Sequence, residues 1–112
     1  SKQRQELRHR LSVLLGHLLK WEYQPQHRSR SWLATIRIQR RDIGRLLQDN
    51  PSLQPYLNEA LQETYENAKD LAMGETDLPS ETFSRQCDYD INSMLNTTFF
   101  RNDHNAWRAL LD

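Results

Sequence analysis

Apolar residues recur at helical spacing in three stretches of the chain. The stretches cover residues 3–22, about 31–49 and about 52–73. Apolar positions three or four residues apart fall on one side of an α-helix, and that side is buried against another element. The pattern therefore predicts three long amphipathic helices. Their apolar stripes contain Leu7, Leu11, Leu14, Leu15, Leu18 and Trp21 in the first, Trp32, Leu33, Ile36, Ile43, Leu46 and Leu47 in the second, and Leu53, Tyr56, Leu57, Ala60, Leu61, Ala68, Leu71 and Ala72 in the third.

The first of these helices has the broadest apolar stripe. Val13 and His17 widen it on one flank, so we expect this helix to be central. Gly16 falls on its narrow polar face, where glycine costs about 1 kcal/mol relative to alanine unless another segment approaches the backbone closely. A turn containing Pro25 closes the helix, because a proline restricts the residue before it to extended geometry.

Residues with capping preferences set the ends of the other two helices. Ser29 or Ser31 is predicted to be the N-cap of the second helix, because a serine hydroxyl accepts a hydrogen bond from an N–H of the first turn. Pro55 is tolerated only in a first turn, which places the N-cap of the third helix at Ser52. Gly74 is predicted to follow the last turn of that helix as the C′ residue.

The helical pattern weakens in the last third of the chain. Residues 75–89 are predicted to form a loop or single-turn segment that crosses the helices and is anchored by Leu78 and Phe83. Aspartates are suitable N-caps, and two of them precede short helical patterns. The resulting predictions are a helix at residues 91–95 capped by Asp90 and another at residues 106–111 capped by Asp103.

Two polar residues interrupt the apolar stripe of the second helix. Gln39 and Arg40 fall among its apolar positions rather than opposite them. An unpaired buried guanidinium is prohibitive, so we expect a carboxylate or the carbonyl groups of a helix end to hold Arg40 inside the bundle. Together with His17 of the first helix, these two residues form a candidate buried polar cluster.

Charge is distributed unevenly along a chain whose formal net charge is zero. Residues 1–50 contain 11 Lys and Arg against four Asp and Glu, whereas residues 51–112 contain four against 11. The candidate anion or partner face comprises Arg28, Arg30, Arg37, Arg41 and Arg45, in the turn and on the outer side of the second helix. An acidic face on the outer side of the third helix comprises Glu59, Glu63, Glu66 and Asp70. These surfaces either neutralise each other within the chain or serve a charged partner.

Composition agrees with one helical domain. The chain has 112 residues, 37% of them hydrophobic, and only three Gly and four Pro, too few for the many turns of an all-β fold. We therefore predict a single all-α domain over residues 1–112, a small helical bundle of three main helices with short C-terminal helices. A lone cysteine, Cys87, is typical of a reducing compartment. With no signal peptide and no membrane-spanning run, this predicts a cytoplasmic protein.

Several motifs resemble those of a known family. They are HLLKWEYQPQHRSRSW at residues 17–32, TIRIQRRDIGRLLQDNPSLQPYL at residues 35–57, Ala68-x-x-x-Ala72 with Glu75-Thr76, and Cys87-x-Tyr89 before Ile91. Over about residues 7–96 the chain resembles a bacterial, mainly cyanobacterial, family known as domain of unknown function twenty-nine. The resemblance implies an all-helical cytoplasmic protein and carries over no catalytic residue. A further N-terminal helical segment usual in that family is absent here, and residues 97–112 match its pattern poorly, so we expect an incomplete core.

The residue patterns favour neither metal-dependent nor nucleophilic catalysis. No two of the four histidines are spaced to lie on adjacent turns of one helix, and the three glycines are isolated, so no metal and no cofactor is predicted. Cys87 is adjacent to Asp88 and close to Asp90, whose charges raise a thiol pKa, the wrong direction for a nucleophile. No catalytic residue is predicted, although an enzyme that uses neither metal nor nucleotide stays an open alternative.

The predicted function is that of a small interaction or scaffold module. We expect it to self-associate or to bind a protein, because the charged faces and an apolar flank at Val13 and His17 would be completed by a neighbour. The alternative is a nucleic-acid-binding module in which the arginines follow phosphates and Trp32 or Tyr23 stacks on a base. The acidic face would repel the same phosphates, so a protein partner is favoured. No membrane partner is predicted.

Overall fold

The computed structural model describes residues 1–101, and every regular element in that part of the chain is a helix. The helices are α1 (Lys2–Tyr23), α2 (Arg30–Asp49), α3 (Leu57–Gly74) and the short α4 (Ile91–Leu95). Short 3₁₀ helices lie at Pro25–His27, Pro51–Tyr56 and Ser80–Thr82. The architecture confirms the predicted all-α fold with three main helices. The second short helix, predicted at residues 106–111, lies outside the described residues.

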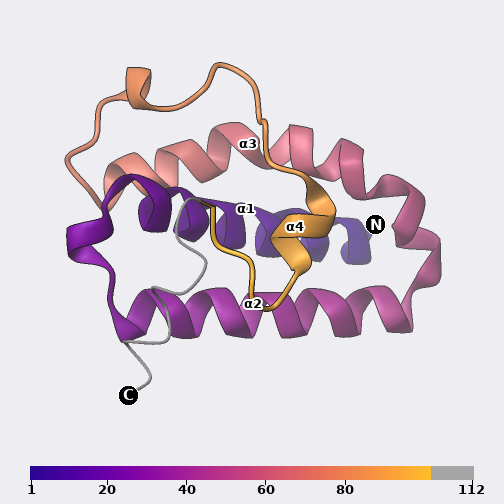
Figure 1. Cartoon of the computed structure of the whole chain (residues 1–112). Coiled ribbons are helices and arrows are strands. Elements are labelled where there is room, and N and C mark those ends of the chain that lie inside the picture. Colours follow the sequence, from indigo (N-terminus) through magenta and orange to yellow (C-terminus); the bar gives the residue numbers. More distant parts are fainter. Residues whose placement is uncertain (102–112) are drawn as a thin grey trace.

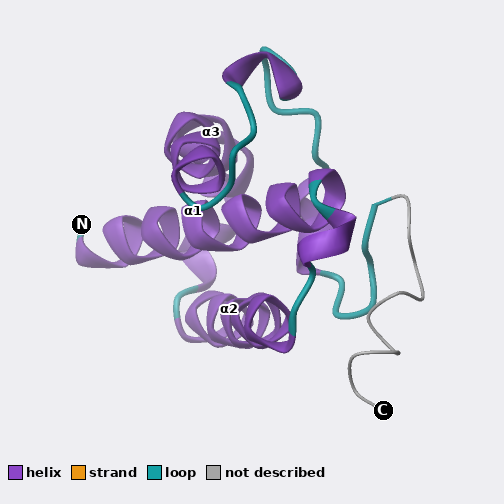
Figure 2. Cartoon of the chain, turned by 90° about the vertical axis from the view of Figure 1, so that its left-hand side faces the viewer, coloured by secondary structure: helices purple, strands orange, loops and turns teal. Residues whose placement is uncertain are grey.

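Helix α1 lies between the other two long helices. Figures 1 and 2 show α3 on one side of it and α2 on the other. The main contacts of α2 and of α3 are both with α1. The expectation that the first helix is central is confirmed, and α2 and α3 form the two opposite edges of the helical layer.

The side of α1 that meets α3 carries small and polar residues. Ser12, Gly16 and Lys20 follow at intervals of four and are all buried. A Cβ atom added to Gly16 would lie 2.7 Å from Cδ2 of Leu71 and 3.2 Å from the backbone oxygen of Ala68. Gly16 thus lies on a side with polar residues, as predicted, and that side is buried against α3. The close backbone approach that would justify a glycine is present, because α3 crosses α1 at this point.

The predicted caps of α2 and α4 are confirmed. The hydroxyl of Ser29 accepts a hydrogen bond from the N–H of Trp32 at 3.1 Å. Asp90 caps α4 by accepting from the N–H of Ser93, also at 3.1 Å. Each side chain satisfies a backbone donor that has no partner within its helix, so the cap fixes where the helix begins.

The ends of α3 differ from the prediction. Ser52 is not its N-cap, because Pro51–Tyr56 form a 3₁₀ helix that places both prolines ahead of the α-helix. Proline has no N–H to donate, so the α-helical hydrogen-bond ladder starts only after this segment. Gly74 is the last residue of α3 rather than the residue beyond it, and the N–H of Glu75 bonds the carbonyl of Leu71 at 3.1 Å.

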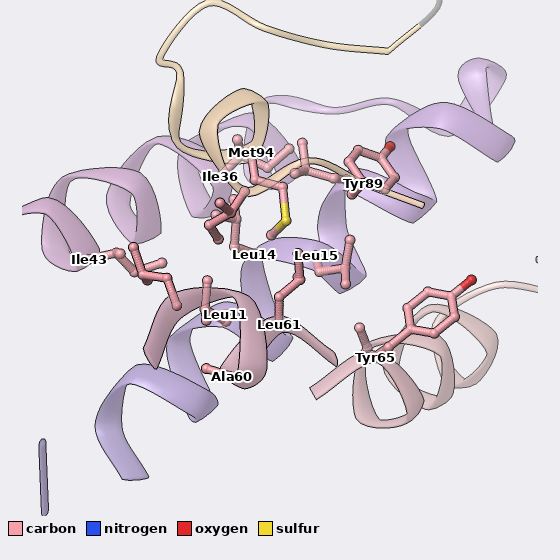
Figure 3. Close-up of a cluster of buried hydrophobic side chains, with 14 of the residues drawn as sticks. Leu11, Leu14, Leu15, Ile36, Ile43, Ala60, Leu61, Tyr65, Tyr89 and Met94 are labelled. Atoms are coloured by element: carbon pink, nitrogen blue, oxygen red, sulfur yellow. The ribbon is translucent and has the colours of Figure 1, made fainter. Parts of the chain in front are cut away.

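Residues 75–101 complete the core. In Figure 1 the first part of this segment arches beyond α3, and the part with α4 then crosses in front of the long helices. Helix α4 contacts α2 and α3, and Figure 3 shows Met94 and Tyr89 among the buried side chains of the long helices. The predicted anchors of this segment are both in place, since Phe83 is buried and Leu78 packs against the core.

Candidate functional site

The three residues of the predicted buried polar cluster bond different parts of the chain. His17 hydrogen-bonds the carbonyl of Val13 at 2.8 Å, and burial lowers the pKa of its imidazole. Gln39 accepts a hydrogen bond from Nη1 of Arg10 at 3.2 Å. Because Gln39 and Arg40 are consecutive on one helix, their side chains diverge by about 100° and meet different neighbours. The structure does not bring the three together into one site.

Arg40 is buried between α2 and the C-terminal segment, with 4% of the residue exposed. Its Nε donates to the carbonyl of Met94 at 2.6 Å and its Nη2 to the carbonyl of Phe99 at 2.7 Å. The expectation that carbonyls of a helix end hold Arg40 is confirmed for Met94, which belongs to α4. The guanidinium carbon lies 5.2 Å from the centre of the Phe100 ring. Burial lowers the pKa of Arg40 to about 10, so it is still charged at pH 7.

Arg28 in the turn and Arg30 at the start of α2 are already engaged. Nε of Arg28 donates to the carbonyl of Trp21 at 2.8 Å, and its guanidinium carbon lies 5.1 Å from the centre of the Trp21 ring. Arg30 also takes part in an interaction. The contacts of Arg28 fasten the turn to α1, so its guanidinium is less available to a partner.

The other three arginines of the predicted face lie on α2 and fall into two groups. Arg45 shares a depression with Asp42 and Asp49, so acidic groups surround it. Arg37 and Arg41 instead line a cavity of about 260 Å³ between α2 and the segment that follows α4. The basic face predicted from the sequence is therefore concentrated at Arg37 and Arg41.

The predicted acidic face runs along the outer side of α3. Its members are all exposed: Glu59, Glu63, Glu66 and Asp70. Glu63 accepts a hydrogen bond from the hydroxyl of Tyr56 at 2.7 Å, and Glu66 pairs with Lys69 at 2.6 Å. Within residues 1–101 the other two carboxylates have no ion-pair partner. Because α1 separates α3 from α2, the acidic and basic faces lie on opposite edges of the molecule (Figure 2).

A second cavity, of about 560 Å³, lies where α1 and α3 end and α2 begins. Close to it, Lys20 is buried with 1% of the residue exposed. Its ammonium group forms an ion pair with Glu75 and lies 4.6 Å from the centre of the Trp32 ring. A carboxylate and an aromatic face together compensate a charge that is costly to bury. The residues lining the cavity are Gln24, His27, Trp32, Gly74, Glu75, Thr76 and Asp77.

Sequence analysis did not single out Lys20 and Glu75. A lysine outside the apolar stripe has the usual pattern of a solvent-facing residue. The available signal was its spacing of four from Gly16, the glycine that already indicated a close approach of another segment. Both residues also belong to the motifs behind the family resemblance, and the structure shows that these motifs meet at one end of the bundle.

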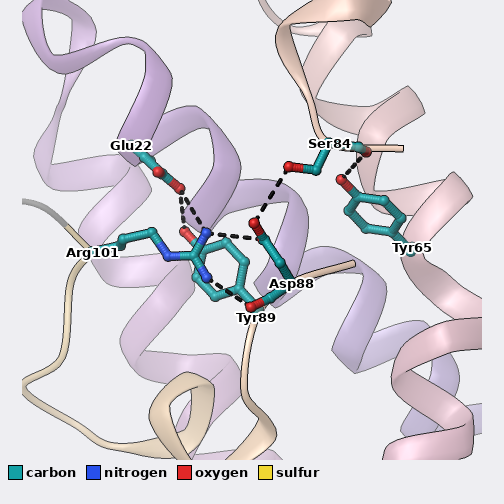
Figure 4. A network of polar contacts seen from close by, with 6 residues as sticks. All are labelled: Glu22, Tyr65, Ser84, Asp88, Tyr89 and Arg101. Carbon is teal, nitrogen blue, oxygen red and sulfur yellow. Dashed lines mark hydrogen bonds and ion pairs between the residues drawn. The ribbon is translucent and has the colours of Figure 1, made fainter. Parts of the chain in front are cut away.

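A polar network ties the C-terminal segment to α1 and α3 (Figure 4). The hydroxyl of Tyr89 donates to Glu22 at 2.8 Å, and Arg101 lies 3.8 Å from the same carboxylate. The hydroxyl of Tyr65 donates to the carbonyl of Ser84 at 2.6 Å. Burial raises the pKa of Tyr89, which keeps it protonated as a donor. The network acts as a tether between segments distant in the sequence.

The cysteine, the potential metal ligands and the helices of residues 1–101 are each predicted to lack a particular role. Cys87 is half-buried, and its pKa is raised as predicted, although burial rather than the charge of Asp88 is the main cause. Within residues 1–101, His, Cys, Asp and Glu side chains form no group of three suited to a metal ion. None of the helices in that part has the length and apolar character needed to cross a membrane.

Comparison with protein-family models gives one match, to the family described as domain of unknown function DUF29, over residues 1–100. The match extends beyond both ends of the region in which the motifs suggested a resemblance. No curated protein and no solved structure matches the chain significantly. Because the family model covers nearly all of the sequence, the chain belongs to the family of domain of unknown function DUF29.

Proposed function

We propose that this protein is an assembly module that associates with further copies of itself through oppositely charged edges. The observation that carries the proposal is the central position of α1 (Figure 1). It holds α2 and α3 apart, so the basic and acidic faces of one molecule lie on two helices separated by α1. Two copies can bring these faces together, which a single chain cannot do.

The contact surface on α2, which we name the α2 face, consists of Arg37, Ile38 and Arg41. All three side chains are exposed, and within residues 1–101 neither arginine has an ion-pair partner. Ile38, with 45% exposure, is the exposed large hydrophobic side chain of that part of the chain. An apolar centre flanked by charges suits a protein contact, because the apolar group contributes affinity and the charges set orientation.

The acidic face of α3 is opposite in charge to the α2 face. At a rise of 1.5 Å per residue, the α2 face extends over about 6 Å of helix between Arg37 and Arg41, and the acidic face extends over about 17 Å between Glu59 and Asp70, so the longer acidic face can cover the α2 face. A contact between two different faces is head-to-tail, so its repetition forms a ring or an open filament. Exposed ion pairs contribute little each, and the association is therefore weak and sensitive to salt.

Nucleic-acid binding is less well supported. Binding that depends on the phosphate backbone commonly involves about 6–10 phosphate contacts. Arg28 is fastened to Trp21, and Arg45 lies among acidic groups. The α2 face then contributes only Arg37 and Arg41, too few to follow a polyanion.

Charge reversal tests the proposal. One variant carries Arg37→Glu and Arg41→Glu, and a second carries Glu59→Lys and Asp70→Lys, all at exposed positions. In light scattering at low salt we expect the mass of the wild-type protein to rise with concentration, whereas each variant alone stays monomeric. A 1:1 mixture of the two variants should associate, because each then offers a face complementary to the other.

A matched control reverses two exposed charges away from both edges, Lys2→Glu and Arg85→Glu. It changes net charge as much as the first variant and should leave the wild-type association intact. A wild-type protein that is monomeric at high concentration and low salt would contradict self-assembly. So would a mixture of the two reversed variants that fails to associate.

A further inference from the structure

We propose that the cavity between α2 and residues 97–100 binds a small organic carboxylate. The cavity has a volume of about 260 Å³ and opens beside the α2 face. Its wall combines guanidinium, hydroxyl and apolar surfaces, which come from Arg37, Arg40 and Arg41, from Thr97 and Thr98, and from Leu33 and Phe100. This site does not depend on self-association, since one chain supplies every group.

The charges around the cavity are unbalanced. Three arginines share its wall, and no acidic side chain is among the described residues that line it. Asp42, which follows Arg41 in the sequence, accepts a hydrogen bond from Arg10 at 3.2 Å instead. Like charges repel more strongly in a partly enclosed space than in water. A bound anion offsets that repulsion.

Arg40 provides the second, independent observation. Only 4% of the residue is exposed, and two of its nitrogens donate to backbone carbonyls, so the side chain is fixed in place. Within residues 1–101, Nη1 has no hydrogen-bond partner. A buried charged donor without an acceptor is costly, and native structures seldom leave one unsatisfied. Nη1 is itself buried, so an oxyanion bound to the exposed Arg37 and Arg41 would offset the charge of Arg40 through space rather than by a hydrogen bond to this atom.

The remaining wall identifies the class of anion. Carboxylates pair with guanidinium groups through two parallel hydrogen bonds. The hydroxyl of Thr97 can donate to the same oxygens, whereas that of Thr98 already donates to Asn96 at 3.1 Å. The lining as a whole is more apolar than polar, and an inorganic anion cannot use that apolar surface. The volume lies just below the range of about 300–1,000 Å³ that is usual for drug-sized ligands. A monocarboxylate on a short acyl or aromatic carrier fits these features.

Titration with benzoate tests the site. Benzamide serves as a neutral molecule of the same shape, and inorganic phosphate as an anion without an apolar part. Calorimetry gives the affinities, and the Nε–H signals of the arginines in nuclear magnetic resonance spectra locate the ligand. We expect benzoate to bind and to shift the Arg37, Arg40 and Arg41 signals, with benzamide and phosphate binding at least about tenfold more weakly.

Two matched variants separate this site from general attraction of anions. Arg37→Gln removes a charge from the cavity and should weaken benzoate binding at least about tenfold, since a charge-assisted hydrogen bond is lost. Arg45→Gln removes the same charge from the same helix outside the cavity and should leave binding unchanged. Repeating the titration with the Glu59→Lys/Asp70→Lys variant keeps the cavity and excludes head-to-tail contacts. Equal weakening by both glutamine variants, or tighter binding of phosphate than of benzoate, would overturn the proposal.

Discussion

Replacing Lys20 by methionine removes a charge from the interior of the bundle and keeps an unbranched side chain. In the wild-type structure the Lys20 side chain is 2% exposed and pairs with Glu75, whose side chain is 53% exposed. The Trp32 ring faces the same ammonium group at 4.6 Å. Lys20 is buried and Glu75 is half-exposed, so the loss of unfolding free energy should depend on which of the two charges is removed.

The magnitudes follow from that asymmetry. Removing one partner of a fully buried pair costs about 3–5 kcal/mol, because the other charge stays buried. Water screens the half-exposed Glu75, and the aromatic ring still faces the ammonium, so Glu75→Gln should cost about 1–3 kcal/mol. Lys20→Met leaves only the half-exposed carboxylate unpaired, so its effect should stay within about 1 kcal/mol. In the Lys20→Met background, Glu75→Gln should change the free energy of unfolding by less than about 0.5 kcal/mol.

Urea unfolding followed by circular dichroism measures these free energies for the wild-type protein, both single variants and the double variant. The slope of free energy against urea should be equal for all four proteins, so that differences in midpoint report stability. Two results would refute the reasoning. One is a Lys20→Met variant less stable than Glu75→Gln, and the other is an equal cost of Glu75→Gln in both backgrounds.

Three further predictions concern stability, pH and thiol chemistry. Gly44→Ala should raise the free energy of unfolding by about 0.5–1 kcal/mol, because nothing lies within 4 Å of the added Cβ. Gly16→Ala should lower the free energy of unfolding by about 1–2 kcal/mol, because the added Cβ crowds a backbone oxygen at 3.2 Å. If thermal unfolding showed that Gly16→Ala stabilises the protein as much as Gly44→Ala, the close crossing of α1 and α3 would be contradicted. Burial lowers the folded-state pKa of His17 below the unfolded value of about 6.5, so the unfolded state binds more protons and stability falls as pH drops below that value. In urea midpoints at pH 7.5 and 5.5, His17→Gln should reduce this loss, and an unchanged loss would exclude the contribution. Burial raises the pKa of the Cys87 thiol, so alkylation at pH 8 should be slower in the native protein than in urea; equal rates would count against it.

Features governed by neighbouring residues were readable from the sequence. The three long helices follow from apolar spacing, and Ser29 and Asp90 cap the helices that they were expected to cap. The exception at Ser52 has a local cause as well. Two prolines within six residues favour a 3₁₀ segment, and the sequence pattern does not distinguish that segment from the first turn of an α-helix.

Features created by packing were harder to predict. An apolar stripe identifies one buried side of a helix, whereas α1 is buried on two sides, and the second side is formed by Ser12, Gly16 and Lys20. Arg40 could be predicted as buried because it interrupts a stripe, yet its carbonyl partners lie more than 50 residues away in sequence. The two cavities depend on such distant contacts, so neither was visible as a motif.

The double burial of α1 also determines where this fold tolerates change. From Leu11 to Trp21 no residue of α1 is exposed, so nearly every substitution there alters a packed contact. The outer sides of α2 and α3 have no such constraint, and their charges can be exchanged without repacking the interior. Related chains can thus retain an identical central helix and still diverge in which partners their edges accept.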